Sequence, residues 1–159
     1  MDTSYHFTHV LCIAIAGQKV LLAQKQSGHG AGKWNGFGGK IHAGETPSEA
    51  AHRECMEEAG IEVTSLKPAG ELLFKYADNE DSAYEHRVAL FIIEAFKGSP
   101  VSTAEMGSPT WFSVNDIPYH GMWPDDATWL PLVLAGKRIR GTFSFDSNQD
   151  IVHHSISNY

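Results

Sequence analysis

The sequence predicts an α/β (α+β) domain in which a mixed β-sheet is covered by two helices. Three observations support this fold class: short apolar runs typical of strands recur along the chain, residues 46–60 carry strong helix signals, and residues 124–135 resemble a second helix. With 159 residues, the chain has the length of one domain, so we expect residues 1–159 to fold together. Its 42% hydrophobic content is enough for a core without disulfides.

The N-terminal part begins with a predicted β-hairpin. Residues 10–16 and 19–24 are β-type runs, and Gly17-Gln18 between them suits a tight turn. Residues 27–39 then contain six glycines. Glycine allows positive φ and a close approach of the backbone to another group, so we expect this segment to contact something closely.

The segment 46–60 is the clearest predicted helix. Thr46 is a good N-cap, Pro47 suits the first helical position, and Glu49 completes a capping box. Gly60 follows as a candidate C-terminal cap.

The rest of the chain alternates predicted strands with one further helix. Strands are expected at residues 61–63, 70–76, 87–96 and 110–112, with the acidic segment 77–82 as a solvated hairpin tip. A second helix is predicted at residues 124–135, in which Pro131 must lie near the first turn or bend the helix. Residues 137–145 and 151–156 are expected to form a closing hairpin.

The excess of acidic side chains bears on which molecules the protein can bind. The formal net charge is -7, from 12 basic and 19 acidic side chains, which argues against a nucleic-acid binder because such proteins carry a basic surface. A small anionic substrate remains compatible with this charge, since a bound divalent cation inverts the local potential.

Several features predict a soluble cytoplasmic protein, and we expect it to act as a monomer. Cys12 and Cys55 lie in apolar surroundings and are expected to be reduced core residues. Residues 1–8 lack the basic region of a signal peptide, and residues 10–16 are too few to span a membrane. The nine histidines show no metal-ligand spacing.

The predicted helix concentrates acidic side chains on one face. At about 100° per residue, Glu54, Glu57 and Glu58 share a face, whereas Ala51, Cys55 and Ala59 form a separate apolar stripe. Like charges at this spacing cost roughly 0.2–0.5 kcal/mol per pair, and the helix dipole disfavours anions near the C-terminus. A divalent cation such as Mg²⁺ would remove both costs. The alternative interpretation is a solvated acidic face without a ligand.

The residues around this helix resemble the Nudix hydrolase family. Gly39, five residues, Glu45, seven residues and then the run from Arg53 to Ile61 (Arg-Glu-Cys-Met-Glu-Glu-Ala-Gly-Ile) match its signature without a gap. The match departs only at Cys55, where the family usually has an aliphatic residue, and a small hydrophobe serves there.

The resemblance implies a Nudix fold, with the sheet between helices, and a Mg²⁺ site in which Mn²⁺ can substitute. It assigns Glu54 and Glu58 as main metal ligands and Glu57 as an assisting one, and it adds the backbone carbonyl near Gly39. Arg53 would orient one of the carboxylates, and Glu45 would serve in a structural or outer position. Which glutamate removes a proton from the attacking water varies within the family.

Outside this signature the chain resembles the oxidised purine nucleoside triphosphatases, the animal-type MutT homologues. Similar segments are residues 30–40, 98–101, 105–106, 111–112 and 122–126, with Trp129 and Pro131, within a similarity that extends over about residues 20–156. The resemblance implies hydrolysis of 8-oxo-dGTP- or 2-hydroxy-dATP-type nucleotides to the monophosphate and pyrophosphate. It also implies that Glu105 is a further metal ligand and that Lys25 and Gly38 contact the substrate.

The remaining candidate residues suit a purine pocket. Trp123 can stack on a base, Phe74 and Tyr76 can extend the aromatic wall, and Asn35 offers both a donor and an acceptor. Asp125 and Asp126 are adjacent acids, and burial and mutual repulsion would keep one of them protonated. The pair could then donate as well as accept hydrogen bonds.

The sequence is compatible with other roles for some of these residues and with other substrates. Asp125 and Asp126 could instead cap the second helix. His29 stands where related enzymes place an aromatic residue that lines the pocket. The register of the N-terminal strand does not define whether Thr8 corresponds to the base-contacting threonine of the family. The substrate could be ADP-ribose, a dinucleoside polyphosphate or a normal NTP, and a non-catalytic nucleotide sensor is a third class.

Overall fold

The computed structural model describes residues 6–79 and 82–159. In chain order its elements are β1 (His9–Ala16), β2 (Lys19–Gln24), β3 (Trp34–Asn35), β4 (Phe37–Lys40), α1 (Pro47–Ala59), β5 (Glu62–Asn79), β6 (Ser82–Lys97), β7 (Thr110–Ser113), the short 3-10 helix η1 (Tyr119–Gly121), α2 (Asp126–Leu134), β8 (Ile139–Phe145) and β9 (Ile151–Asn158). None of the helices in these residues is long and apolar enough to cross a membrane.

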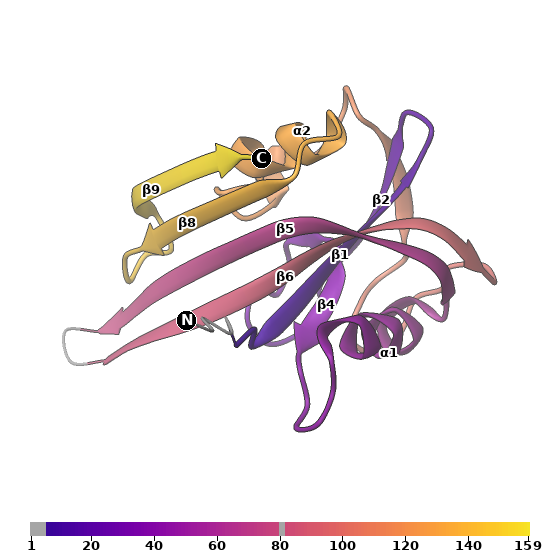
Figure 1. Cartoon of the computed structure of the whole chain (residues 1–159), viewed down its shortest axis with the longest axis horizontal. Helices are drawn as coiled ribbons and strands as arrows, with labels where there is room; N and C mark the ends of the chain where they lie inside the picture. The colour runs from indigo at the N-terminus through magenta and orange to yellow at the C-terminus, as the bar shows by residue number, and fades with distance from the viewer. Residues whose placement is uncertain (1–5, 80–81) are drawn as a thin grey trace.

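The strands form one mixed sheet, as the sequence predicts. Its main order is β3-β2-β1-β6-β5-β8-β9, with β4 paired to β1 and β7 paired to β2. β1 runs parallel to β6 and β5 runs parallel to β8, whereas the other pairs are antiparallel. Helices α1 and α2 lie on opposite sides of this sheet (Figure 1). The expected fold class is therefore confirmed.

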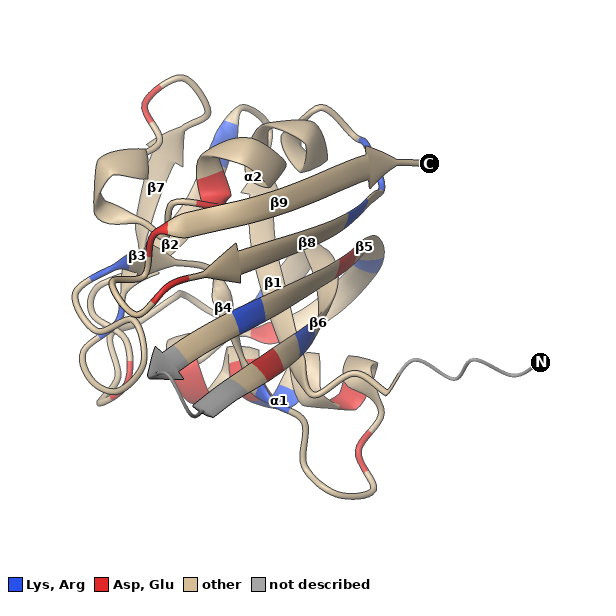
Figure 2. Cartoon of the chain, turned by 90° about the vertical axis from the view of Figure 1, so that its left-hand side faces the viewer, with Lys and Arg blue, Asp and Glu red and all other residues tan. Residues whose placement is uncertain are grey.

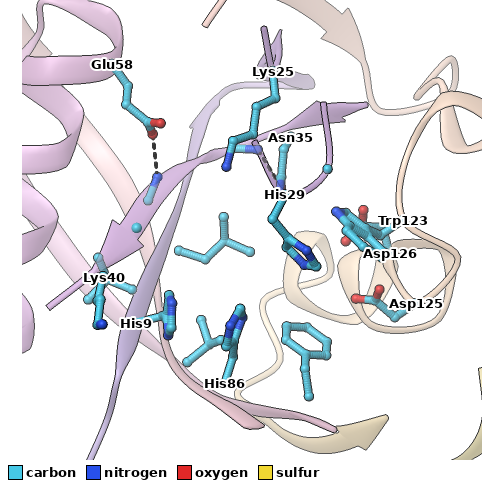
Figure 3. A pocket seen from close by; sticks show the side chains of 18 of the residues that line it. His9, Lys25, His29, Asn35, Lys40, Glu58, His86, Trp123, Asp125 and Asp126 are labelled. Carbon is cyan, nitrogen blue, oxygen red and sulfur yellow. Dashed lines mark hydrogen bonds between the residues drawn. The ribbon is translucent and has the colours of Figure 1, made fainter. Parts of the chain in front are cut away.

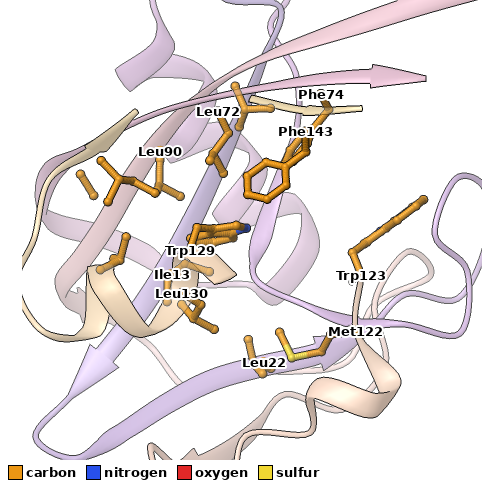
Figure 4. Close-up of a cluster of buried hydrophobic side chains, with 14 of the residues drawn as sticks. Ile13, Leu22, Leu72, Phe74, Leu90, Met122, Trp123, Trp129, Leu130 and Phe143 are labelled. Atoms are coloured by element: carbon orange, nitrogen blue, oxygen red, sulfur yellow. The ribbon is translucent and has the colours of Figure 1, made fainter. Parts of the chain in front are cut away.

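Each helix packs on its own core. On the α2 side, Trp129 and Leu130 pack among the buried residues Ile13, Leu72 and Leu90 (Figure 4). On the α1 side, the apolar stripe predicted from the helical wheel is fully buried against the other face of the sheet: Ala51, Cys55 and Ala59. Strand β1 serves both cores because its side chains alternate between the two faces.

Helix α1 has the ends that the sequence predicts. The Thr46 side chain accepts a hydrogen bond from the Glu49 amide at 3.1 Å, and the Glu49 carboxylate accepts one from the Thr46 amide at 3.2 Å. Gly60 ends the helix with a φ of 67°, a conformation that glycine adopts without strain. These contacts fix which residues point to each side of the helix.

The predicted strands 61–63 and 70–76 are wrong as separate elements. Residues 62–63 and 70–76 belong to the single strand β5, whose register against β6 shifts near Ser65 and between Pro68 and Gly70. These irregularities let a long strand continue through residues that usually end one. The expected hairpin tip at 77–82 is also too long, since β5 reaches Asn79 and β6 begins at Ser82, and its centre lies outside the described residues.

The C-terminal boundaries also differ from the expectation. Helix α2 begins at Asp126 rather than at residue 124, so Pro131 lies inside the helix beyond its first turn. Strand β8 begins at Ile139, and β9 continues to Asn158 because it pairs with the whole of β8.

Candidate active site

Two glycines bring strand β4 into direct contact with the carboxylates of α1. The Gly38 amide donates a hydrogen bond to Glu58 Oε1 at 2.8 Å. A Cβ atom at Gly39 would lie 2.5 Å from Glu54 Oε1. Neither glycine has a positive φ, so the sequence requires glycine here for close approach. Positive φ is confined, within the glycine-rich segment, to Gly28, Gly30 and Gly32.

A third carboxylate joins the two on α1 from a distant loop. Glu54, Glu58 and Glu105 each offer an oxygen atom, and these atoms lie within 4.8 Å of one another. Thr103 holds the loop by donating its hydroxyl to the Glu58 carbonyl at 3.1 Å, and the Gln26 amide donates to the Glu105 carbonyl at 2.9 Å. The structure thus brings together three of the acids that the sequence nominated.

The electrostatics of this carboxylate group fit a divalent cation. Burial raises the pKa of Glu58 to about 8, and the negative charges of Glu54 and Glu105 contribute in the same direction. Burial also raises the pKa of Glu54, although Arg53 opposes it. Clustered carboxylate oxygens are the donors that Mg²⁺ and similar hard cations prefer, and such a cation would stabilise the ionised forms.

Arg53 organises the acids around this group. Its guanidinium donates to Glu45 at 2.6 and 2.8 Å, to Glu54 at 2.8 Å and to Glu57 at 3.2 Å. It also donates to the Lys40 carbonyl at 3.0 Å, which ties helix α1 to the end of β4. The bonds from Arg53 and from the His42 amide lower the pKa of Glu45 to about 2.

Glu57 lies apart from the other helix acids. Its side chain is 48% exposed, and it is not a member of the carboxylate group formed by Glu54, Glu58 and Glu105. The helical wheel places the three glutamates on one face, but the packing of β4 covers only Glu54 and Glu58.

A pocket of about 260 Å³ runs from Glu58 to the start of α2 (Figure 3). Of the residues nominated for substrate binding, it is lined by Lys25, Asn35, Gly38, Phe74, Trp123, Asp125 and Asp126. Tyr76 also lines it. The acidic residues at its two ends come from opposite sides of the sheet: those at one end lie on α1, and those at the other lie at the start of α2 (Figure 2).

Asp125 and Asp126 are buried acids at the far end of this pocket. Asp125 accepts a hydrogen bond from the Trp129 indole at 2.7 Å, and its side chain makes no bond to the helix N-terminus, so the capping interpretation is wrong for it. Burial raises the pKa of both carboxyls, and the charge of Asp125 raises that of Asp126 further. Among the residues that the structure describes, Asp126 Oδ2 is buried and has no hydrogen-bond partner.

The aromatic residues form one connected wall. The Trp123 ring lies 6.1 Å from that of Tyr76, and Tyr76 lies 6.3 Å from Phe74. On the opposite wall, Asn35 Oδ1 accepts from the Gly36 amide at 2.9 Å.

Three histidines in the pocket were not identified as a group from the sequence. His9, His29 and His86 all line it, with His9 and His86 stacked at 3.9 Å between ring centroids. The alternation of β1 could have placed His9 on the same face as Leu11, but the meeting with His86 depends on the pairing of β1 with β6.

The protein family follows from these features together with sequence comparison. Residues 6–133 match the NUDIX domain family, so the chain belongs to the Nudix hydrolases, as the resemblance indicated.

Relatives with named activities are similar over almost the whole chain. The oxidized purine nucleoside triphosphate hydrolase of Danio rerio is 40% identical over 146 residues, which cover 92% of this chain and 91% of that protein. The mouse (Mus musculus) protein of the same name is 38% identical over 98% of this chain and 96% of its own length. Among solved structures, a mutator MutT protein from Bacillus halodurans superimposes with a TM-score of 0.82 at 25% identity, covering 94% of this chain and 96% of that one.

Proposed function

We propose that this Nudix hydrolase converts oxidised or otherwise modified purine nucleoside triphosphates to the monophosphate and pyrophosphate. The observation that carries the proposal is the partnerless Oδ2 atom of Asp126, buried at the end of the pocket opposite the carboxylate group. A buried polar atom without a partner costs about 1–3 kcal/mol, and a ligand that bonds to it recovers this cost. The relatives from zebrafish and mouse carry names that match such a substrate.

The two acids can read the edge of a modified purine. Burial raises the pKa of both carboxyls, and the charge of Asp125 raises that of Asp126 further, which favours a protonated Asp126 beside an ionised Asp125. A protonated carboxyl donates and an ionised one accepts, so the pair matches an edge that carries both an acceptor and an N–H donor. Trp123 supplies a flat surface for stacking.

The carboxylate group is suited to the phosphate end of the substrate. Glu54, Glu58 and Glu105 would hold Mg²⁺, which Mn²⁺ can replace, and the carbonyl near Gly39 would join them. When bound, such a cation neutralises phosphate charge and lowers the pKa of a coordinated water. Glu57 would assist at the exposed edge, and Lys25 would contact a phosphate.

The chain's own groups hold this arrangement in place. Arg53 keeps Glu45, Glu54 and Glu57 in fixed positions, and the Gly38 amide orients Glu58. Glu54, Glu57 and Glu58 are the candidates for the base that accepts a proton from the attacking water. We further propose that the protein acts as a cytoplasmic monomer on free nucleotides, consistent with its net charge of -7.

Two other functions compete with this one. A Nudix pocket could instead take ADP-ribose, a dinucleoside polyphosphate or an unmodified NTP, and a sensor would bind a nucleotide without hydrolysis. The buried acids Asp125 and Asp126 favour a base-reading pocket, and the complete carboxylate group favours catalysis.

The test is pyrophosphate release with Mg²⁺ from 8-oxo-dGTP, 2-hydroxy-dATP, N6- and O6-methylated purine dNTPs, dGTP and ADP-ribose. A higher kcat/KM for the modified purines is the expected result. Preference for ADP-ribose or unmodified nucleotides would refute the proposed substrate while leaving the Nudix chemistry.

A pair of variants tests the carboxylate group within the same assay. Glu58→Gln should abolish most hydrolysis without loss of folding, whereas the exposed Glu62→Gln should behave as the wild type. Unchanged hydrolysis by Glu58→Gln would contradict the metal assignment.

A further inference from the structure

The middle of the pocket is lined by imidazole rings from three separate segments. His9 comes from β1, His86 from β6 and His29 from the loop before β3. The His9 and His86 rings stack at 3.9 Å with 28° between their planes, and the His29 ring lies 5.6 Å from that of His86. These contacts make a continuous row of rings (Figure 3).

This row connects the two ends of the pocket. At one end His9 pairs in register with Lys40, next to Gly39, where an added Cβ atom would lie 2.5 Å from Glu54 Oε1. At the other end His29 lies against Trp123, with 4.8 Å between the ring centroids. A nucleotide with its phosphates at the carboxylate group and its base at Trp123 spans this row, and its sugar can lie beside His9 and His86.

The ring nitrogens of these two histidines are suited to a neutral hydroxyl. Burial lowers the pKa of His9 and of His86 to about 4, and nearby positive charges contribute in the same direction, so both rings are neutral near pH 7. His9 uses Nδ1 in a 2.8 Å hydrogen bond with Thr8 Oγ1, which leaves Nε2 available. Within the described part of the chain, the His86 ring is engaged in ring contacts alone.

The lysines and the histidines of the pocket suit different parts of a nucleotide. Lys25 and Lys40, which also line the pocket, supply the positive charge that phosphate oxygens require. A neutral imidazole offers one donor and one acceptor, which matches a hydroxyl group. A leucine side chain would fill a similar volume but could neither donate nor accept a hydrogen bond.

We propose that His86, stacked on His9, hydrogen-bonds a hydroxyl of the nucleotide sugar and so sets a preference for sugars that carry this hydroxyl over sugars that lack it. This proposal rests on the proposed function, since it takes the substrate to be a nucleotide whose base lies at Trp123. It assigns to this pair a role in specificity and leaves the chemical step to the carboxylate group.

The test uses one modified purine on four sugars: ribose, 2′-deoxyribose, 3′-deoxyribose and 2′,3′-dideoxyribose. For the wild type, loss of the contacted hydroxyl should lower kcat/KM about three- to tenfold, the size expected for one hydrogen bond between neutral groups. His86→Leu should lower kcat/KM by the same factor for substrates that carry this hydroxyl and leave the others unchanged.

Two further variants separate recognition from folding. His86→Gln keeps a donor and an acceptor and should restore part of the sugar preference. His153→Leu, on the exposed strand β9, is the matched control and should leave all four values unchanged. Thermal unfolding of each variant shows whether His86→Leu is folded, and binding of the four nucleoside monophosphates by calorimetry gives the same comparison without turnover.

Equal losses on all four sugars in His86→Leu would overturn the proposal, and so would a wild type that is indifferent to the sugar. Failure of the wild type to hydrolyse or bind any modified purine nucleotide would instead refute the proposed function. The two failures are therefore distinguishable.

Discussion

The amide of Gly38 and the carboxylate of Glu58 are joined by a 2.8 Å hydrogen bond across twenty residues of sequence. This bond fixes the orientation of a buried acid on α1 from the backbone of β4. A side chain at Gly38 would collide with the Val10 backbone, so strand β4 can approach α1 and β1 together only with glycine at this position.

Alanine substitutions at the two neighbouring glycines should have different effects. In Gly39→Ala the new Cβ meets the end of the Glu54 side chain, which can rotate away, so the fold should persist. Metal affinity and kcat should fall about 10- to 100-fold, because Glu54 leaves its position. Metal titration by calorimetry, together with kcat, measures both effects.

In Gly38→Ala the Cβ meets the backbone of Val10, which cannot move without breaking the β1–β4 pairing. We therefore expect a loss of about 1–3 kcal/mol in the free energy of unfolding. Chemical denaturation measures this loss. If Gly39→Ala destabilises the protein more than Gly38→Ala, the geometric argument for both positions is wrong.

The contribution of Glu58 to the stability of the metal-free protein should fall as the pH rises. The pKa of Glu58 is about 8 in the folded protein and 4.5 in its ordinary state, so between these values the folded state keeps a proton that the unfolded state has lost. Stability from this group is complete below about pH 4.5 and is lost towards pH 8.

Glu58→Gln removes this dependence, because glutamine does not titrate. In the presence of a chelator, the Tm of Glu58→Gln relative to the wild type should rise between about pH 5 and pH 8, by at least about 2 °C. Asp125 and Asp126, the buried acids remote from Glu58, titrate in the same way in both proteins and cancel from the difference. Parallel Tm curves would show that Glu58 is not protonated in the folded state.

Arg53→Lys should impair catalysis more than folding. Lysine keeps the charge but cannot donate to Glu45, Glu54 and Glu57 at once, since it lacks the planar fork of the guanidinium. We expect kcat to fall about 10- to 100-fold, with a smaller change in Tm. Arg138→Lys, at an exposed position that contacts Tyr159, is the matched control. Similar activities for the two variants would contradict the positioning role.

Asp125→Asn should weaken discrimination between bases. Asparagine keeps an oxygen that can accept from the Trp129 indole, so the fold should be retained, but it removes the ionised partner of Asp126. We expect kcat/KM for a modified purine to fall about tenfold or more relative to the unmodified purine, about the size expected for loss of one charge-assisted bond. Steady-state kinetics on paired nucleotides, with the exposed Asp116→Asn as control, provide the comparison. An equal loss for both nucleotides would contradict it.

Helix α1 and its chemistry could be predicted from the sequence because their determinants are local. Thr46, Pro47, Glu49 and Gly60 define the ends of the helix, and its periodicity then places Glu54 and Glu58 on one face. The family signature adds the expectation of a metal at this face. The same reasoning could not separate Glu57 from the other two, because exposure depends on what packs against the helix.

The remaining parts of the site were decided by the tertiary structure. Glu105 reaches Glu58 only through the loop that Thr103 anchors, and His9 meets His86 only because β1 pairs in parallel with β6. Such contacts join segments distant in sequence, so their register depends on how both faces of the sheet pack. Local pattern therefore determined the helix and its acids, whereas long-range strand pairing determined the shape of the pocket and the side chains that line it.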